Sequence, residues 1–333
     1  MRATLTTRAL VLSGALLSAG PSFAAADPGL LPKEGEVVKD KKPEGWDPGL
    51  TLGVSFAVSS NSNFVGQPNG NSLTGGLNLL GTLDYLQGVI DWRNLLKINE
   101  VFTQTPIIDD FVKTIDQLYF ESILYYRVSD TFGPFVSFKL DTTLLEGRDV
   151  RAADVDYALG GETVAEDVTS IKLTDPFQPL SLKEALGVFL RPISKKTIEV
   201  DIRAGFGASE TFADGARLVT DDAATDGIIE LTALEDVIQA GAVLEVGAKG
   251  ELEEGRVNYG AHAEVMMPFV NDDPAERSVT DLTNFDISAK LGFKLFSWAS
   301  LDYELKVLRM PQLVDDWQIQ NNLLLTFSYA LVE

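Results

Sequence analysis

The only histidine of the chain, His262, stands two residues before Glu264. In an extended strand, residues two apart point to the same side, so the imidazole and the carboxylate would share one face. Such a pair can act as a general base, and Ser288 is the nearest candidate nucleophile by sequence order. No flanking motif supports catalysis, so we expect a hydrogen-bonded structural pair and no enzyme. A single histidine also excludes a histidine-rich zinc site, and we expect no metal and no cofactor.

Many other charged side chains alternate with apolar residues in the same way, and both signs are interleaved along neighbouring segments. If the segments form a closed barrel, these charges line its lumen, where they must be paired or hydrated. Two interpretations stay open, a lumen filled by ion pairs and a narrow channel with opposing charges. Asp286 lies on this face as well. The predicted lumenal charge ladder consists of Arg93, Lys97, Glu121, Arg127, Lys139, Asp141, Glu199, Asp201, Arg203, Glu245, Lys249, His262, Glu264, Lys290, Lys294, Asp302, Glu304 and Lys306.

Carboxylates are also concentrated in two long segments, 144–176 and 210–236. Clustered carboxylates can bind Ca²⁺ or Mg²⁺, so divalent cations are candidate partners of these segments. Neither segment has the spacing of an EF-hand or of a nonapeptide repeat. We therefore favour the simpler interpretation of two solvated acidic loops.

The elements that must position these residues are long segments in which apolar and polar residues alternate. The segment 317–331 is the clearest, and a two-residue period over about 9–11 residues is typical of a strand that crosses a membrane at a tilt. The sequence therefore predicts an all-β fold, an antiparallel transmembrane β-barrel of twelve strands. The predicted strands are 50–59, 73–85, 90–99, 117–127, 136–141, 182–190, 198–207, 238–249, 258–267, 285–295, 301–307 and 317–331.

The connections between these segments alternate in length, which is typical of outer-membrane barrels with short periplasmic turns and long extracellular loops. A barrel in lipid must leave no open edge, so we expect the first and last strands to pair. Aromatic residues near the strand ends predict interface girdles, at Tyr85, Trp92, Tyr126, Phe285, Trp298, Trp317, Phe327 and Tyr329. The predicted long connections are 60–71, 102–114, 144–181, 210–236, 270–283 and 309–316, and the short ones are 87–88, 129–133, 192–196, 253–256 and 296–299.

The first residues have the composition of a secretory signal. Arg2 and Arg8 flank a short apolar run, and small residues at 24–26 would permit cleavage. We expect a signal peptide at 1–26, a polar periplasmic leader at 27–48 and the barrel at 49–333. The chain has no cysteine, which excludes disulfides. Its net charge of −22 would repel a phosphate backbone, so nucleic acid is not an expected partner.

The segment from Trp46 to Asp116 resembles an uncharacterised outer-membrane β-barrel family of Gram-negative bacteria, a domain of unknown function met in Bacteroidetes. The resemblance rests on 60–63, Gly66, 71–72, 92–94 and 113–116. It implies location and fold, and therefore the lipid bilayer, lipopolysaccharide and the barrel-assembly machinery as partners. Assembly signals commonly finish on a terminal aromatic residue, whereas this sequence finishes on 331–333, so Phe327 and Tyr329 are expected to serve instead.

Three functions remain compatible with these features. The first is an integral outer-membrane barrel that acts as a narrow passive channel or as a structural envelope protein with a charge-paired lumen. The second is a surface binding or adhesion protein that acts through its acidic extracellular loops. A barrel hydrolase is the third and least supported, and a large soluble periplasmic β protein is the non-membrane alternative.

Overall fold

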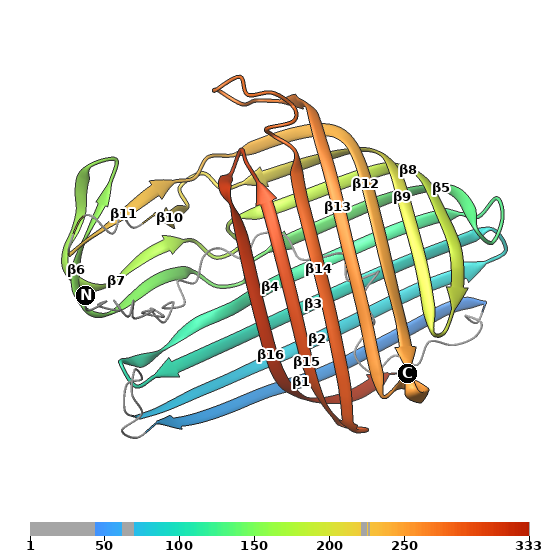
Figure 1. The fold of residues 1–333 in the computed structure, drawn as a ribbon, viewed down its shortest axis with the longest axis horizontal. Helices are drawn as coiled ribbons and strands as arrows, with labels where there is room; N and C mark the ends of the chain where they lie inside the picture. The colour runs from blue at the N-terminus through green and yellow to red at the C-terminus, as the bar shows by residue number, and fades with distance from the viewer. Residues whose placement is uncertain (1–43, 62–69, 221–224, 226, 333) are drawn as a thin grey trace, which may run out of the picture.

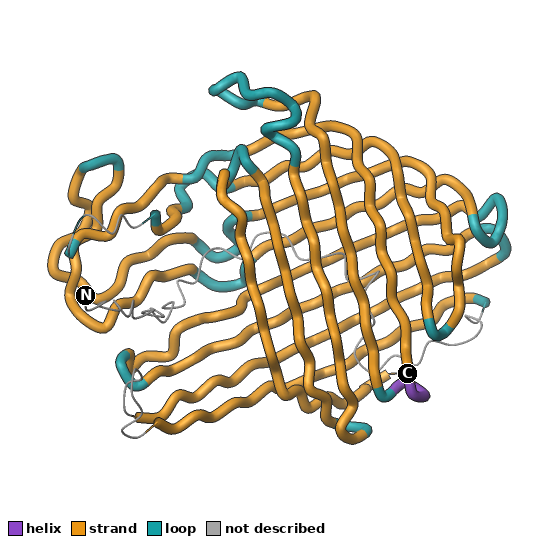
Figure 2. The backbone as a smooth tube through the Cα atoms, viewed as in Figure 1, coloured by secondary structure: helices purple, strands orange, loops and turns teal. Residues whose placement is uncertain are grey.

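The computed structural model of the chain describes residues 44–61, 70–220, 225 and 227–332. The predicted signal peptide and residues 27–43 of the predicted leader lie outside this part. The described residues form a closed barrel and a smaller four-stranded sheet beside its mouth (Figure 1). Almost all of the described regular structure is strand, and Glu253–Gly255 forms a single 3₁₀ turn (Figure 2). Nowhere in the described part is there a helix with the length and apolar character needed to span a membrane.

Twelve strands close the barrel, each antiparallel to both neighbours, in the order β1-β16-β15-β14-β13-β12-β9-β8-β5-β4-β3-β2. Each corresponds to one of the twelve predicted segments, so the predicted fold class is confirmed. The strands are β1 (Gly45–Asn61), β2 (Gly70–Gln87), β3 (Ile90–Thr105), β4 (Ile108–Tyr126), β5 (Phe132–Thr142), β8 (Leu180–Lys195), β9 (Ile198–Phe212), β12 (Val237–Leu252), β13 (Val257–Asn271), β14 (Asn284–Phe296), β15 (Ala299–Met310) and β16 (Val314–Val332).

Alternation along each strand separates an apolar exterior from a polar interior. On β5, Val136 is 58% exposed on the outside, whereas Ser137 and Lys139 are buried on the inside. The same contrast holds on β8 and β9, where Leu186 and Phe206 face outward. This arrangement is the reverse of a soluble protein, whose apolar side chains gather inside. The pattern therefore suits a wall with lipid on its outer surface.

The first and last strands pair, as the need for closure predicts. Their register runs from Leu50 opposite Val332 to Ser55 opposite Thr326. β1 begins at Gly45, before the predicted barrel boundary at residue 49, and pairs with β2 along its whole length. Beyond Ser55, β1 and β16 diverge towards the end of the barrel that carries the small sheet (Figure 1).

Two connections that we predicted to be long are tight turns. β3 continues to Thr105 and β4 begins at Ile108, so only two residues join them. β15 and β16 are likewise separated only by 311–313. In both cases the strands run further than the clear alternation does, because their ends place apolar residues inside the barrel, Val101 and Ile115 on β3 and β4 and Leu308 and Met310 on β15. Short and long connections therefore alternate less regularly along the chain than the sequence predicts.

The two acidic segments are not simple loops. They contain β6 (Gly147–Leu159), β7 (Glu162–Thr174), β10 (Arg217–Val219) and β11 (Ile228–Ala233), which form a sheet in the order β10-β11-β6-β7. β11 and β6 are parallel, although they come from different connections of the barrel. The sheet has a core of its own, built from Tyr157, Leu173, Ile229 and Leu231. Repeated register shifts between β6 and β7 interrupt the two-residue period, which hid these strands in the sequence.

Tyr157 supplies a pH-dependent contact in this small sheet. Its hydroxyl donates a hydrogen bond to Asp149 at 2.8 Å, and the same carboxylate oxygen accepts the Arg151 Nε at 2.6 Å. Burial of the hydroxyl, and then its bond to Asp149, raise the pKa of Tyr157. Because the folded pKa is the higher one, this contribution to stability is complete below the unfolded value of about 10 and is lost as the pH rises through the folded value.

We therefore expect subtilisin to cleave 147–174 faster as the pH rises above about 10, beyond the change in the activity of the protease on a peptide control. Tyr157→Phe should remove this alkaline step, because phenylalanine has no proton to lose. It should also cost about 1 kcal/mol at neutral pH, where the hydrogen bond to Asp149 is missing. An alkaline step that persists unchanged in Tyr157→Phe would assign the effect to another group.

Aromatic rings gather at the end of the barrel that has the short turns. Trp46 lies against Tyr85 and Trp92, with ring centroids 4.8 and 5.8 Å away. On the far side of the seam, Trp298 stacks between Phe296 and Phe327. Exposed amphipathic rings at one level are what an aromatic girdle requires at a membrane interface. At the opposite end, the predicted members Phe285 and Trp317 lie 5.6 Å apart.

Candidate functional site

A group of ion pairs crosses the middle of the lumen. The Lys139 ammonium on β5 lies 3.1 Å from Glu245 on β12 and 3.0 Å from Glu264 on β13. Lys183 on β8 binds the other oxygen of Glu264 at 2.9 Å, and Arg203 on β9 binds Glu245 at 2.6 Å. The five strands β5, β8, β9, β12 and β13 are consecutive in the barrel order, so these contacts reach along one side of the inner wall from β5 to β13. We call these five residues the central ion-pair layer.

The central ion-pair layer is almost free of water. The side chains of Arg203 and Glu245 are 0% and 1% exposed. Ions buried in a medium of low dielectric constant must be paired and hydrogen-bonded, and here each cation has at least one carboxylate partner. Lys139 and Glu264 are 9% exposed and Lys183 is 17% exposed, so little water reaches this part of the lumen.

A second group of charges lies nearer to the short turns. Arg191 Nη2 is 2.8 Å from Asp201, and Arg93 Nη2 is 2.8 Å from Asp91. Glu199 lies at 4.0 Å from both guanidinium groups, which links the two pairs. The exposed fraction of the side chains rises to 15% at Arg93 and 18% at Glu199, so water approaches from this end.

A layer of apolar side chains packs between these two groups of charges. It consists of Ile123, Tyr125, Phe135 and Phe189, which belong to β4, β5 and β8 and point inward. Tyr125 and Phe189 meet edge to face with centroids 4.9 Å apart. Guanidinium groups from both charged layers cover the rings, with Arg191 5.5 Å from the Tyr125 centroid and Arg203 5.7 Å from that of Phe135.

The opposite mouth carries a further apolar cluster. Leu308, Met310 and Leu313, around the turn between β15 and β16, pack against residues at the start of β12 and in the connection that precedes it. Met310 is 2% exposed. The cluster bridges inner faces that are separated by β13 and β14 along the wall. Its remaining buried members are Ala213, Ala216, Leu234 and Val237.

The structure brings together many of the residues predicted for the lumenal ladder. Glu121, Asp141 and Asp302 are also buried on the inner face, and Lys290 pairs with Glu304 at 3.5 Å. Lys97, Lys294 and Lys306 lie half-buried on inward positions. The members that contact the central ion-pair layer or the Arg191 group are Arg93, Lys139, Glu199, Asp201, Arg203, Glu245, Lys249, His262 and Glu264.

Arg127 does not belong to the ladder. It lies beyond the last residue of β4, donates a hydrogen bond to the Gly88 carbonyl oxygen and pairs at 4.0 Å with the fully exposed Asp130. Arg127 therefore sits on the rim of the barrel at the short turns. By the alternation along β4, the side chain of residue 127 would point inward. β4 ends at Tyr126, however, so the alternation no longer applies to Arg127.

Three members of the network were absent from the predicted ladder: Asp91, Lys183 and Arg191. Lys183 and Arg191 lie on β8, the weakest of the predicted strands, because Glu184 occupies its outward face. Leu186 and Val188 have even numbers and face outward, so the alternation along β8 would have placed the odd-numbered Lys183 and Arg191 inside. Asp91 stands two residues before Arg93 on the inward face of β3, so the same rule would have found it.

The arrangement around His262 is not that of a hydrolase. Ser288 stands directly opposite His262 in the register of β13 and β14. Within the described part of the chain, however, neither nitrogen of His262 nor the Ser288 hydroxyl has a hydrogen-bond partner. Ser288 is also buried. A nucleophile that is neither hydrogen-bonded to a base nor open to substrate does not form an acyl-transfer site.

Several carboxylates of the acidic segments have structural partners. Glu146 pairs with Arg148, and Lys172 pairs with Asp175. Asp236 accepts hydrogen bonds from the backbone amides at the start of the β9–β12 connection. Over residues 44–61, 70–220, 225 and 227–332, the one group of three metal-ligating side chains that converges is in the barrel and not in these segments.

Comparison with known proteins gives a family match and matches to solved structures. Residues 56–147 match the family described as "Protein of unknown function (DUF3078)", which overlaps the segment on which the sequence resemblance rests. A comparison with curated proteins finds no match.

Solved structures that resemble the chain include three outer-membrane proteins. The translocator domain of the autotransporter NalP from Neisseria meningitidis has a TM-score of 0.36 at 9% identity, over 87% of this chain and 90% of that one. The COG4313 outer membrane channel from Pseudomonas putida F1 has a TM-score of 0.36 at 11% identity, over 88% and 97%. A mutant of the TodX monoaromatic hydrocarbon channel has a TM-score of 0.36 at 11% identity, over 88% and 91%. Over residues 56–147, the chain is thus similar to the DUF3078 family of proteins of unknown function.

Proposed function

We propose that this chain is an integral outer-membrane barrel of a Gram-negative bacterium whose lumen is closed at rest by its own side chains. Its role is then that of a structural envelope protein and not of an open passive channel. The single observation that carries this proposal is the central ion-pair layer, in which Lys139 of β5 reaches Glu245 of β12 and Glu264 of β13 and the three side chains are at most 9% exposed. The apolar layers on both sides of it support the same conclusion.

The membrane location is supported by the distribution of apolar surface. Outward side chains such as Leu186 and Leu323 are more than half exposed around the barrel, whereas many of the inward ones are charged. An apolar exterior of this extent would make a soluble protein aggregate. The short turns and the aromatic rings beside Trp46 and Trp298 are expected on the periplasmic side. The four-stranded sheet is then outside the cell.

The location is tested by fractionation of cells that express the full chain. We expect the protein in the outer-membrane fraction, with faster migration on unboiled than on boiled gels. Protease added to intact cells should cleave 147–174 and leave the barrel protected. Recovery in the soluble periplasmic fraction would contradict the membrane assignment, and cleavage only after the outer membrane is opened would contradict the orientation.

Closure is tested by osmotic swelling of liposomes that contain the folded protein. We expect arabinose to enter these vesicles no faster than it enters protein-free vesicles, because the buried layers leave no aqueous path. A general porin, reconstituted at the same protein-to-lipid ratio, provides the positive control. Swelling as rapid as that of the control would show that the barrel is an open channel and would contradict the proposed closure.

A second function, partner binding at the cell surface, is supported by one observation. Two separate connections of the barrel combine into a sheet with its own apolar core, whereas a connection that only links two strands can be a simple loop. Deleting 150–172 should remove β6 and β7 while the barrel keeps its heat-modifiable migration. If the sheet is an adhesive module, attachment of the cells to a surface should fall with this deletion, and unchanged attachment would exclude the role.

A further inference from the structure

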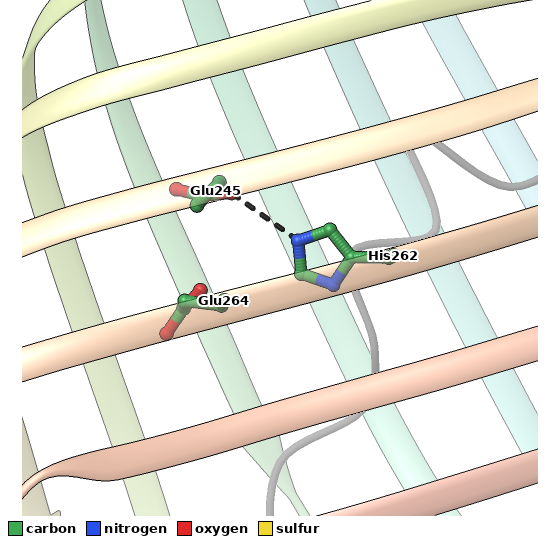
Figure 3. Close-up of side chains that lie close together, drawn as sticks. All are labelled: Glu245, His262 and Glu264. Atoms are coloured by element: carbon green, nitrogen blue, oxygen red, sulfur yellow. Dashed lines mark ion pairs between the residues drawn. The ribbon is translucent and has the colours of Figure 1, made fainter.

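Three metal-ligating side chains converge on the inner wall of the barrel. Glu245 projects from β12, and His262 and Glu264 project from β13, with the imidazole beside the two carboxylates, which stand opposite each other in the strand register (Figure 3). One ligand atom from each lies within 4.8 Å of the others. The nearest measured approach is 3.5 Å, between His262 Nε2 and Glu245 Oε2.

His262 is the second and independent indication of a ligand. Its side chain is 1% exposed. Nε2 lies 3.5 Å from Glu245 Oε2, whereas Nδ1 has no hydrogen-bond partner among the described residues. Burying a polar nitrogen without a partner is unfavourable, because the nitrogen gives up its hydrogen bonds to water. A buried imidazole that lies beside two carboxylates and keeps one nitrogen without a partner is arranged to meet a ligand that binds nitrogen and oxygen together.

Other oxygen atoms nearby also lack partners within the described chain. The Ser288 hydroxyl stands opposite His262 in the strand register, and Asp286, opposite Glu264, has its Oδ1 unpartnered. Both are buried. They surround the same stretch of β13 and add oxygen donors to the imidazole and the two carboxylates.

Resident cations already neutralise the carboxylates. Lys139 bridges Glu245 and Glu264, Arg203 also binds Glu245, and Lys183 binds the second oxygen of Glu264. A further cation added to these three would be repelled at short range. A divalent cation can therefore bind only if it displaces one of these three cations. The Lys139 ammonium is the candidate, because it contacts both carboxylates and its side chain is flexible.

We propose that Glu245, His262 and Glu264 form a binding site for a divalent transition-metal cation of the Zn²⁺ class, which competes with the Lys139 ammonium. One imidazole nitrogen with two carboxylate oxygens is a ligand set that zinc accepts, at about 2.0–2.2 Å from the ion. The three ligand atoms must then draw together to roughly 3.3 Å from one another, which rotation of the glutamate side chains allows. Water reaches the edge of the site, where Lys183 is 17% and Glu264 is 9% exposed.

Exchange would have a structural consequence. Lys139 ties β5 to β12 and β13, so an ion that takes its place removes that tie from the central ion-pair layer. The ion would hold β12 and β13 to each other instead. The proposal goes beyond closure at rest, because a barrel can be closed whether or not it binds zinc.

The experiment uses the full chain without a histidine tag, folded in detergent, with Zn²⁺ as the probe in isothermal titration. We expect one Zn²⁺ per chain and a shift of the imidazole NMR signals, which can come only from His262 because the chain has one histidine. His262→Ala should weaken binding about tenfold or more, and Lys139→Met should strengthen it by a similar factor. Asp154→Asn in the acidic small sheet is the control and should change nothing.

Heat-modifiable migration establishes that each variant is folded. No stoichiometric Zn²⁺ binding by the natural chain overturns the proposal, whatever Lys139→Met does. Binding that survives His262→Ala, or that is lost in Asp154→Asn, overturns it as well, since it assigns the ion to the acidic segments. Affinity that is unchanged or lower in folded Lys139→Met contradicts the competition between the ion and the ammonium. None of these results depends on whether the lumen conducts.

Discussion

Replacing Glu245 by alanine is expected to lower the free energy of unfolding by about 3–5 kcal/mol. The Glu245 carboxylate accepts contacts from Lys139 at 3.1 Å and from Arg203 at 2.6 Å. Removing it leaves the Arg203 guanidinium, which is 0% exposed, without its closest carboxylate. Water cannot replace the lost charge. Chemical denaturation of the folded protein in detergent or vesicles, followed by tryptophan fluorescence, measures the change.

Glu304→Ala is the matched control for this prediction. Glu304 also faces the lumen and also pairs with a lysine, Lys290 at 3.5 Å, but its side chain is 25% exposed. Water can solvate the ammonium that this variant leaves behind, so the loss of stability should be clearly smaller. Equal losses at Glu245 and Glu304 would mean that the central ion-pair layer is hydrated, which contradicts its assignment as a seal.

Phe189→Ala is expected to cost about 3–5 kcal/mol through the cavity that it leaves. Phe189 is fully buried, packs edge to face on Tyr125 and carries the Arg191 guanidinium 5.6 Å from its ring centroid. Despite this loss, the variant should stay closed to ions, because the central ion-pair layer is intact. Denaturation gives the cost, and conductance of the folded variant tests the second expectation.

Phe296→Ala provides the comparison. Phe296 is 61% exposed on the outer surface, where it stacks on Trp298 near the short turns. Its truncation removes a contact at the membrane interface and leaves no internal cavity, so the cost should be much smaller. A similar cost for Phe189 and Phe296 would show that the inner aromatic layer is loosely packed.

The alternation of residue types was sufficient to predict the barrel because one physical contrast repeats on every strand. Lipid outside and charge inside leave a two-residue period, as on β9, where Ile202 and Phe206 alternate with Asp201 and Arg203. The same contrast explains why closure between β1 and β16 could be predicted. It could not reveal the small sheet, whose strands have solvent in place of lipid and whose period is broken by register shifts.

The interior was predicted less completely than the wall. Alternation assigns a residue to a face, but not to a partner across the lumen, so the contact of Lys139 with Glu245 could not be derived. The inward residues Tyr119, Ile123 and Tyr125, two aromatic and one aliphatic, blurred the pattern of β4, because a packed interior accepts apolar side chains. A rule that expected only polar residues inside could not foresee the aromatic layer.

The conductance of the natural full-length chain in planar lipid bilayers tests the central claim most directly. Insertion is verified beforehand by heat-modifiable migration of the same preparation, and a general porin serves as the positive control. The closed central ion-pair layer predicts a silent membrane over many insertions at moderate voltage. Discrete conductance steps of reproducible size in the natural chain, with ohmic current, would contradict a lumen sealed at Lys139, Glu245 and Glu264.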